Sequence, residues 1–148
     1  MDIRHIYLLG FVLLLFSCDP NSREISLSIN NKTNQTFKIN LFMNSEENSF
    51  DISELISIQF LKYSALGGGF NAIADFDSIK IYNTINGKKI KWAKPDNTYG
   101  YLDTDNNIGT ERDVPKDIYN SKYWTLQANG DDEEWIFTII ESDLELFE

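Results

Sequence analysis

A two-residue alternation of apolar and polar side chains is the feature that most restricts how this chain can fold. It begins at Ile25–Asn30, where every second residue is Ile or Leu, and it returns with the same period at Phe37–Met43. Such alternation is typical of a β-strand with one buried face, because successive side chains of a strand point to opposite faces. Between the two runs, Asn30–Asn34 has turn-forming residues. The two runs therefore predict an antiparallel hairpin.

The same alternation returns after a polar segment. Asn44–Ser49 has no apolar residue and is expected to be a loop. Leu55–Tyr63 alternates again, with Ile56 on its apolar face, and predicts a further strand. Gly67–Gly69 follows, but no Lys-Ser/Thr pair comes after it, as a phosphate-binding loop requires. We interpret this glycine run as a flexible crossover between two sheets.

A second hairpin is predicted around Asn86-Gly87. Ser78–Ile85 and Lys88–Trp92 alternate on either side of it. Asn-Gly between two alternating runs is a strong hairpin signal, because both residues tolerate the backbone angles of a tight turn. The alternation assigns four side chains of this hairpin to the core: Ile79, Ile81, Ile90 and Trp92.

The last strands and the fold class follow from the C-terminal part of the chain. Lys122–Ala128 and Glu133–Ile140 are expected to pair across Asn129–Asp132, and the second is apolar on both faces, which predicts a central strand. The acidic tail can add a helical turn with Ser142 as its N-cap. About seven short strands separated by turns predict an all-β sandwich in a single domain, with a small β-barrel as the alternative.

Charge restricts the partners of this domain. The chain of 148 residues has a net charge of −10 at pH 7. Nucleic acids bind through clusters of Lys and Arg that contact phosphates, so no nucleic-acid partner is expected. Acidity of this kind more often serves solubility than binding.

The N-terminus predicts a lipid anchor. Ile6–Phe16 is an apolar run preceded by Arg4. A membrane-spanning helix needs about 20 apolar residues, so this run is too short to span and has the length of a signal-peptide core. It ends in Leu15-Phe16-Ser17-Cys18, which resembles the lipobox of bacterial lipoproteins. That resemblance implies cleavage before Cys18 and a membrane attachment through lipid on its sulfur. An ordinary secreted protein and a buried apolar segment with an incidental cysteine are the alternatives.

Cleavage at that point divides the chain into three parts. Residues 1–17 would be a lipoprotein signal peptide, 18–24 a tether, and 25–148 the β-sandwich domain. The expected location is the bacterial cell envelope, with the protein anchored in the outer membrane.

Removal of the signal peptide also restricts the chemistry. His5 is the only histidine and Cys18 the only cysteine of the chain. Without a histidine or a free thiol, catalysis by Ser-His-Asp or Cys-His groups and ordinary zinc sites are excluded. We therefore expect no enzyme activity, no cofactor and no metal.

A resemblance to a family rests on the order of several segments. The chain has an Asn-rich first turn, the strand Asp77–Tyr82 (DSIKIY), the turn Asn86–Lys88 (NGK), the aromatic segment Tyr119–Trp124 (YNSKYW) and the closing segment Phe137–Phe147 (FTIIESDLELF). This order resembles small Gram-negative lipoproteins of unknown function with immunoglobulin-like sandwiches. The resemblance implies a single immunoglobulin-like antiparallel sandwich and an envelope location, and it implies no activity.

The candidate binding residues lie in the long polar segment Lys94–Tyr119. Tyr99 and Tyr101 are the aromatic side chains in it that are not assigned to the core. We expect a non-catalytic binding or structural module that contacts a protein partner through this segment and the acidic hairpin tip Asp131–Glu134. A carbohydrate-binding module that stacks sugars on the two tyrosines is the alternative.

Two further motifs favour simple solvated turns. Asp103–Gly109 places oxygen ligands at alternate positions, as calcium loops do, but the twelfth position is Val114 instead of Glu. Asp131–Glu134 contains the carboxylates that a glycoside hydrolase needs, yet that reaction requires two carboxyl groups at a fixed separation in a cleft. A hydrolase built on carboxylates is therefore the third and least favoured hypothesis.

Overall fold

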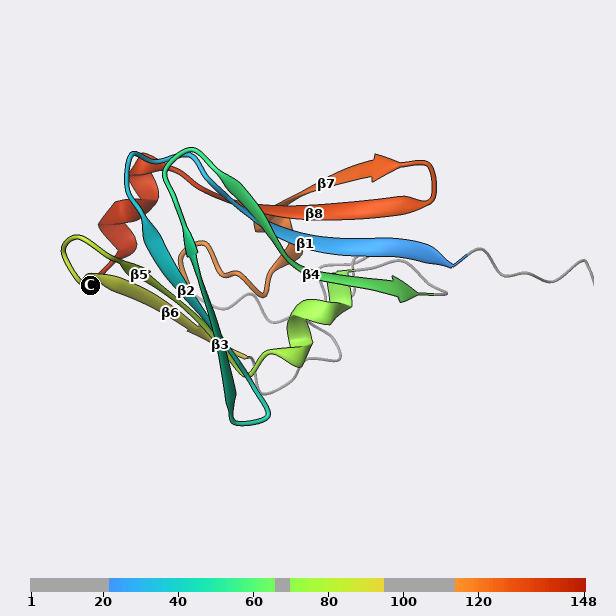
Figure 1. Ribbon diagram of the computed structural model, residues 1–148, viewed down its shortest axis with the longest axis horizontal. Helices are drawn as coiled ribbons and strands as arrows, with labels where there is room; N and C mark the ends of the chain where they lie inside the picture. Colours follow the sequence, from blue (N-terminus) through green and yellow to red (C-terminus); the bar gives the residue numbers. More distant parts are fainter. Residues whose placement is uncertain (1–21, 66–69, 95–113) are drawn as a thin grey trace, which may run out of the picture.

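Two four-stranded sheets face each other in the computed structural model, which describes residues 22–65, 70–94 and 114–148. The strands are β1 Arg23–Asn31, β2 Phe37–Met43, β3 Glu46–Ile52, β4 Ser57–Ala65, β5 Ser78–Asn83, β6 Lys89–Ala93, β7 Trp124–Asn129 and β8 Asp132–Ile139. The first sheet has the order β4-β1-β8-β7 and the second β3-β2-β5-β6 (Figure 1). The predicted all-β sandwich is confirmed, and the sheets do not close into the alternative barrel.

The first sheet is built around β1 and β8. β1 pairs with β4 in antiparallel and with β8 in parallel orientation, so the sheet is mixed and not purely antiparallel as expected. β8 lies between β1 and β7, which confirms the prediction of a central last strand. The predicted hairpin between β7 and β8 is confirmed too, and its turn places Gly130 at a φ of +66°, where a side chain would be strained.

The second sheet contains a strand that the sequence did not predict. β3 covers most of Asn44–Ser49, which was expected to be a loop. It pairs with β2 through a tight turn in which Asn44 and Ser45 have φ values of 51° and 69°. Two successive positive φ values are typical of the hairpin turn that matches the twist of paired strands. The predicted hairpin at Asn86-Gly87 is confirmed as β5 and β6.

The first predicted hairpin is wrong. β1 belongs to the first sheet and β2 to the second, so the chain changes sheets between Asn31 and Phe37. Alternation shows which face of a strand is buried, but it does not show which strand lies beside it. The chain also changes sheets between β3 and β4, and again between β4 and β5. The last of these agrees with the crossover predicted at Gly67–Gly69, although the glycines themselves lie outside the described residues.

The core lies between the inner faces of the two sheets and contains the hydrophobic residues predicted from β5 and β6, except that Ile90 is only half-buried. Figure 1 shows the sheets meeting at one end and diverging toward the other, where the 3₁₀ helix η1 (Phe70–Asp75) lies. Part of the predicted surface loop also enters the core, because Ile118 and Tyr119 are fully buried. The Tyr119 hydroxyl donates to the Phe76 carbonyl at 2.9 Å.

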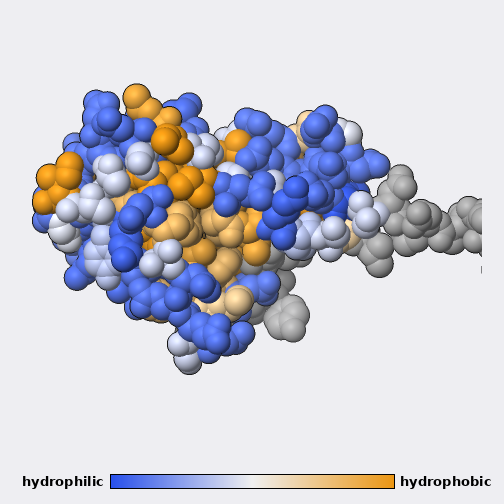
Figure 2. Space-filling view, viewed as in Figure 1, coloured by the Kyte–Doolittle hydropathy of each residue, from blue (hydrophilic) through white to orange (hydrophobic). Residues whose placement is uncertain are grey.

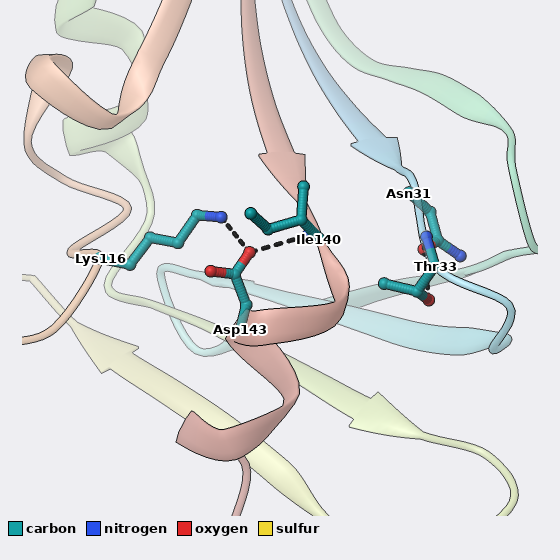
Figure 3. A network of polar contacts seen from close by, with 5 residues as sticks. All are labelled: Asn31, Thr33, Lys116, Ile140 and Asp143. Atoms are coloured by element: carbon teal, nitrogen blue, oxygen red, sulfur yellow. Dashed lines mark hydrogen bonds and ion pairs between the residues drawn. The ribbon is translucent and has the colours of Figure 1, made fainter.

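Short 3₁₀ helices complete the chain: η2 (Ser121–Tyr123) precedes β7, and η3 (Glu141–Leu146) follows β8. The predicted C-terminal turn exists, but its N-cap is Ile140 and not Ser142. The Ile140 amide donates to Asp143 Oδ2 at 2.8 Å, and the Asp143 amide donates to the Ile140 carbonyl at 2.9 Å. Asp143 also forms an ion pair with Lys116, which ties η3 to the segment before β7 (Figure 3). Within the described ranges, every helix is too short or too polar to cross a membrane.

Candidate functional site

Exposed apolar side chains gather at the end of the sandwich opposite the start of β1. Leu55, Ile56, Ile85 and Ile140 have exposed fractions of 68%, 47%, 78% and 43%, and we name these four residues the distal patch. They lie in the β3–β4 connection, in the β5–β6 turn and directly after β8. Figure 2 shows apolar residues at the upper and left margins of this end, with polar residues around them. Polar residues lie between the apolar groups in this view, and exposed apolar groups at one end of a molecule are candidates for contact with other molecules.

The sequence assigned these residues to strands, and three of those assignments are wrong at their ends. β4 begins at Ser57, so Leu55 and Ile56 precede it, and Ile56 is exposed instead of facing the core. β5 ends at Asn83 and β8 at Ile139, so Ile85 and Ile140 lie beyond them. An apolar residue that continues an alternating run is indistinguishable from core in the sequence. Only the ends of the strands in the folded chain reveal that such a residue lies outside the core.

A buried polar hub holds the patch loops in place. Asn31 and Thr33 are fully buried at the point where the chain leaves the first sheet (Figure 3). The Asn31 side-chain amide donates to the carbonyls of Gln35 at 2.7 Å and Ser53 at 2.9 Å. Its oxygen accepts from the amide and the hydroxyl of Thr33 at 3.0 and 2.8 Å. One side chain therefore ties the β1–β2 connection to the β3–β4 connection that contains Leu55 and Ile56.

Two further contacts join the remaining loops to the same hub. Asn83 donates to Gln35 Oε1, and its own side-chain oxygen accepts from the Ile85 amide at 2.9 Å. Asn34 donates its backbone amide to Glu141 Oε1 at 2.9 Å, next to Ile140. The loops that bear the distal patch are thus connected by hydrogen bonds beneath it. A contact surface held in this way needs little ordering when a partner binds.

Leu55 has an unusual backbone conformation. Its φ is +58°, in the left-handed region that branched and bulky residues rarely adopt. A left-handed conformation costs about 1–2 kcal/mol for a residue with a Cβ atom. An exposed leucine gains little burial in return, so folding alone does not explain its presence. Backbone strain of this kind is concentrated at functional sites.

The acidic hairpin tip, which the sequence offered as part of a binding surface, is engaged within the fold. Glu133 pairs with Arg23 at 2.9 Å, and Glu134 accepts from the Ser28 hydroxyl at 2.6 Å. Asp132 accepts from the Glu24 amide at 2.9 Å. These carboxylates attach the start of β1 to β8. The side chains of Glu133 and Glu134 point to opposite faces of the sheet, as neighbours in a strand must, so this pair does not converge on one point.

The other predicted site residues cannot be placed. Cys18, Tyr99, Tyr101 and the motif Asp103–Gly109 lie outside the described residues. Among the residues that are described, no group of three or more His, Cys, Asp or Glu side chains is positioned to hold a metal ion.

Comparison with models of protein families, with curated proteins and with solved structures finds no match for this chain. A function has to be inferred from the geometry of the molecule. Among the described residues, the distal patch is the exposed feature whose side chains and supporting hydrogen bonds are all defined.

Proposed function

We propose that this protein is a lipid-anchored module of the bacterial cell envelope that binds a protein partner through the distal patch and has no catalytic role. The observation that carries the proposal is the exposure of Leu55, Ile56, Ile85 and Ile140 at one end, above a buried polar hub. The segment Leu15-Phe16-Ser17-Cys18, which resembles a lipobox, supports the anchor. The two-sheet architecture is compatible with the immunoglobulin-like lipoproteins that the sequence resembles.

The position of the patch suits a surface-anchored binder. β1 begins at Arg23, within the expected tether 18–24, and its nine residues run toward the distal patch. At about 3.3 Å per residue, this strand alone spans about 30 Å. Lipid on Cys18 would therefore hold one end of the sandwich at the membrane and present the patch on the far side.

The chemistry of the patch favours a protein partner over a glycan. Its four side chains are aliphatic, whereas sugars are usually bound by stacking on aromatic faces. Aliphatic side chains gain free energy by removing apolar area from water, about 25 cal/mol per Å². The partner should therefore present an apolar surface of its own. The carbohydrate alternative depends on Tyr99 and Tyr101 and remains a prediction.

The patch can be tested with a double variant and a matched control. Leu55→Ser with Ile140→Ser removes two exposed side chains of the patch. Leu126→Ser removes a leucine that is 46% exposed in β7, away from the patch. Proteins that cross-link to the native protein in intact cells would be identified and purified. Each would then be titrated against the native protein, the double variant and Leu126→Ser. We expect the double variant to bind its partner at least tenfold more weakly and Leu126→Ser to bind as the native protein does.

A partner that binds the double variant and the native protein equally well contradicts the proposal. The patch could instead join two copies of this chain. Sedimentation of the purified protein tests this, because the double variant would then stay monomeric at concentrations where the native protein forms a dimer.

The anchor has a separate test, which does not depend on the patch. The intact mass of the detergent-extracted protein is compared with that of a Cys18→Ala variant. We expect the native protein to lack residues 1–17 and to carry acyl chains. An unacylated protein that retains His5 would remove the lipoprotein assignment.

A further inference from the structure

β7 forms one edge of the first sheet, and within the described ranges no strand lies on its outer side (Figure 1). Every residue of β7 after Trp124 is exposed, including Leu126, which is 46% exposed. An edge strand presents backbone N–H and C=O groups that are not used within its own sheet, so it can pair with a strand of another chain. β7 is therefore a candidate contact surface, separate from the distal patch.

The other three edge strands have features that oppose such pairing. β3 contains three acidic residues. β4 contains Lys62, which forms an ion pair with Glu24 at 2.7 Å, and its register with β1 shifts at one point. β6 contains two lysines, and one of them, Lys89, exchanges backbone hydrogen bonds with Glu148. Charges, bulges and covering segments all protect an edge from other chains. β7, with the sequence WTLQAN, has no charged residue and no proline.

Hairpin geometry shows which backbone groups of β7 point away from its sheet. Asn129 and Asp132 flank a two-residue turn and therefore form a hydrogen-bonded pair. Such pairs alternate along an antiparallel ladder, so every second residue of β7, counted back from Asn129, bonds to β8. The residues between them, Leu126 and Ala128, direct their N–H and C=O groups outward. In the part of the chain that the structure describes, these four groups have no backbone partner.

This edge is complementary to a second copy of itself. In an antiparallel pair with a two-fold axis at Gln127, Leu126 of one copy lies opposite Ala128 of the other, and the reverse holds as well. Each such pair exchanges two hydrogen bonds, so all four outward groups of each copy are satisfied. The same register places Thr125 opposite Asn129 of the second copy. All the side chains that face each other along the paired strands are uncharged.

The ends of the paired strands are complementary in charge. Antiparallel order places the residues before β7 of one copy beside the β7–β8 turn of the other. Lys122 lies directly before β7, in η2, whereas the turn contains Asp131 and is followed by Asp132. A lysine and two carboxylates therefore come together at each end of the contact. Because the chain has a net charge of −10, two copies repel each other in general, and an uncharged edge with complementary ends favours their approach at β7.

From these observations we propose that β7 pairs with β7 of a second copy of this chain. Each copy contributes the order β4-β1-β8-β7, so the two first sheets become one continuous sheet of eight strands. Open sheets of this size are within the usual range. The pairing depends neither on the distal patch nor on the lipid anchor. The two copies of β1 run in opposite directions in the pair, so each end has one distal patch and one start of β1.

Cysteine cross-linking tests both the pairing and its register. Gln127 and Thr125 are exposed, so replacing either with cysteine leaves the core unchanged. The two copies of Gln127 meet at the axis, with Cβ atoms about 4.5–5.5 Å apart, which is close to what a disulfide needs. The two copies of Thr125 lie four residues apart along the strand, or about 13 Å, which is too far.

The purified proteins are oxidised and analysed on a non-reducing gel. We expect Gln127→Cys to give at least tenfold more disulfide-linked dimer than Thr125→Cys or the native protein with its own Cys18. Equal yields from the two variants, or no dimer from Gln127→Cys, overturn the proposal.

Proline variants test the backbone contact. Ala128→Pro removes an outward N–H and keeps the bonds between β7 and β8, and proline is tolerated at such edge positions. Ser49→Pro is the matched control, because the same alternation, counted from the β2–β3 turn, directs its N–H outward from the edge strand β3. Sedimentation measures the dissociation constant of the dimer. We expect Ala128→Pro to raise it at least tenfold and Ser49→Pro to leave it unchanged. A native protein that stays monomeric, or a dimer that Ala128→Pro does not weaken, contradicts the pairing.

The double variant Leu55→Ser/Ile140→Ser separates this contact from the distal patch. It leaves β7 intact, so it should form the dimer as the native protein does. Ala128→Pro should in turn bind the partner of the patch with native affinity. A dimer that is lost in the double variant would be formed through the patch, and that result would overturn the proposal for β7.

Discussion

Where β1 begins, charged side chains lie at the surface and pair with one another, whereas at the distal end two polar residues, Asn31 and Thr33, are buried and several apolar side chains are exposed. Arg23 and Glu133 form an ion pair at the first end, with exposed fractions of 37% and 15%. At the second end, Asn31 and Thr33 are fully buried while Leu55 is 68% exposed. The two ends belong to the same pair of sheets, so the fold does not require this difference.

The difference separates what holds the sandwich together from what it presents. The charged end uses surface groups to attach one strand to its neighbour, and such pairs contribute little stability. The distal end uses a buried amide to join loops of both sheets, and this frees the surface above it from a structural role. An apolar surface that is not needed for folding is available for binding.

The largest expected effect is that of removing the hub. Asn31→Ala takes away four hydrogen bonds and leaves the carbonyls of Gln35 and Ser53 without their donor. We expect the free energy of unfolding to fall by about 3 kcal/mol, since each buried group left unsatisfied costs about 1–3 kcal/mol. Urea denaturation measures this, with the exposed Asn34→Ala as control, which should change little. A loss below about 1 kcal/mol would show that the hub is not what joins the loops.

Leu55→Asn should have a smaller effect of the opposite sign. Asparagine tolerates the left-handed conformation better than leucine does, so we expect the free energy of unfolding to rise by about 0.5–1 kcal/mol. If the distal patch binds a protein partner as proposed, affinity for that partner should fall in the same variant. Leu126→Asn in β7 is the comparison, and it should be neutral or destabilising and leave the partner bound. If Leu55→Asn destabilises the fold, its side chain is structural and the contrast between the ends weakens.

The smallest effect is expected at the charged end. Arg23→Ala should lower the free energy of unfolding by about 0.5 kcal/mol, because a partly exposed ion pair is worth about 0–1 kcal/mol. The loss should shrink as salt is added, since ions screen the pair. Thermal unfolding at low and high ionic strength measures both quantities. A large loss that salt does not change would mean that Arg23 contributes mainly through packing.

Alternation in the sequence was sufficient to predict the fold class and most of the strands. Trp92 and the isoleucines of β5 were placed in the core correctly, and the turns at Gly87 and Gly130 were recognised from their glycines. β3 was missed because it is an edge strand with few apolar residues, and its turn uses Asn44 and Ser45 instead of glycine. The sheet to which β2 belongs was missed because pairing depends on distant residues.

The candidate sites were less accessible to sequence reasoning. Ile56, Ile85 and Ile140 extend apolar runs, and nothing local shows that they lie outside β4, β5 and β8. A positive φ at Leu55 has no signature in the sequence either, since residues that favour it are Gly, Asn and Asp. These features arise from tertiary structure, so they appear only when the chain is folded.

The parallel pairing of β1 with β8 has a mechanical consequence. If the anchor holds the start of β1 and a partner pulls on the distal end, the force acts along the axis of β1. β1 is hydrogen-bonded on both sides, to β4 and to β8, over most of its length. A load in this direction is shared by many bonds at once in shear, and it does not open them one after another as peeling would. Under the proposed anchoring and binding, β1 is thus the strand best placed to transmit tension between the two ends.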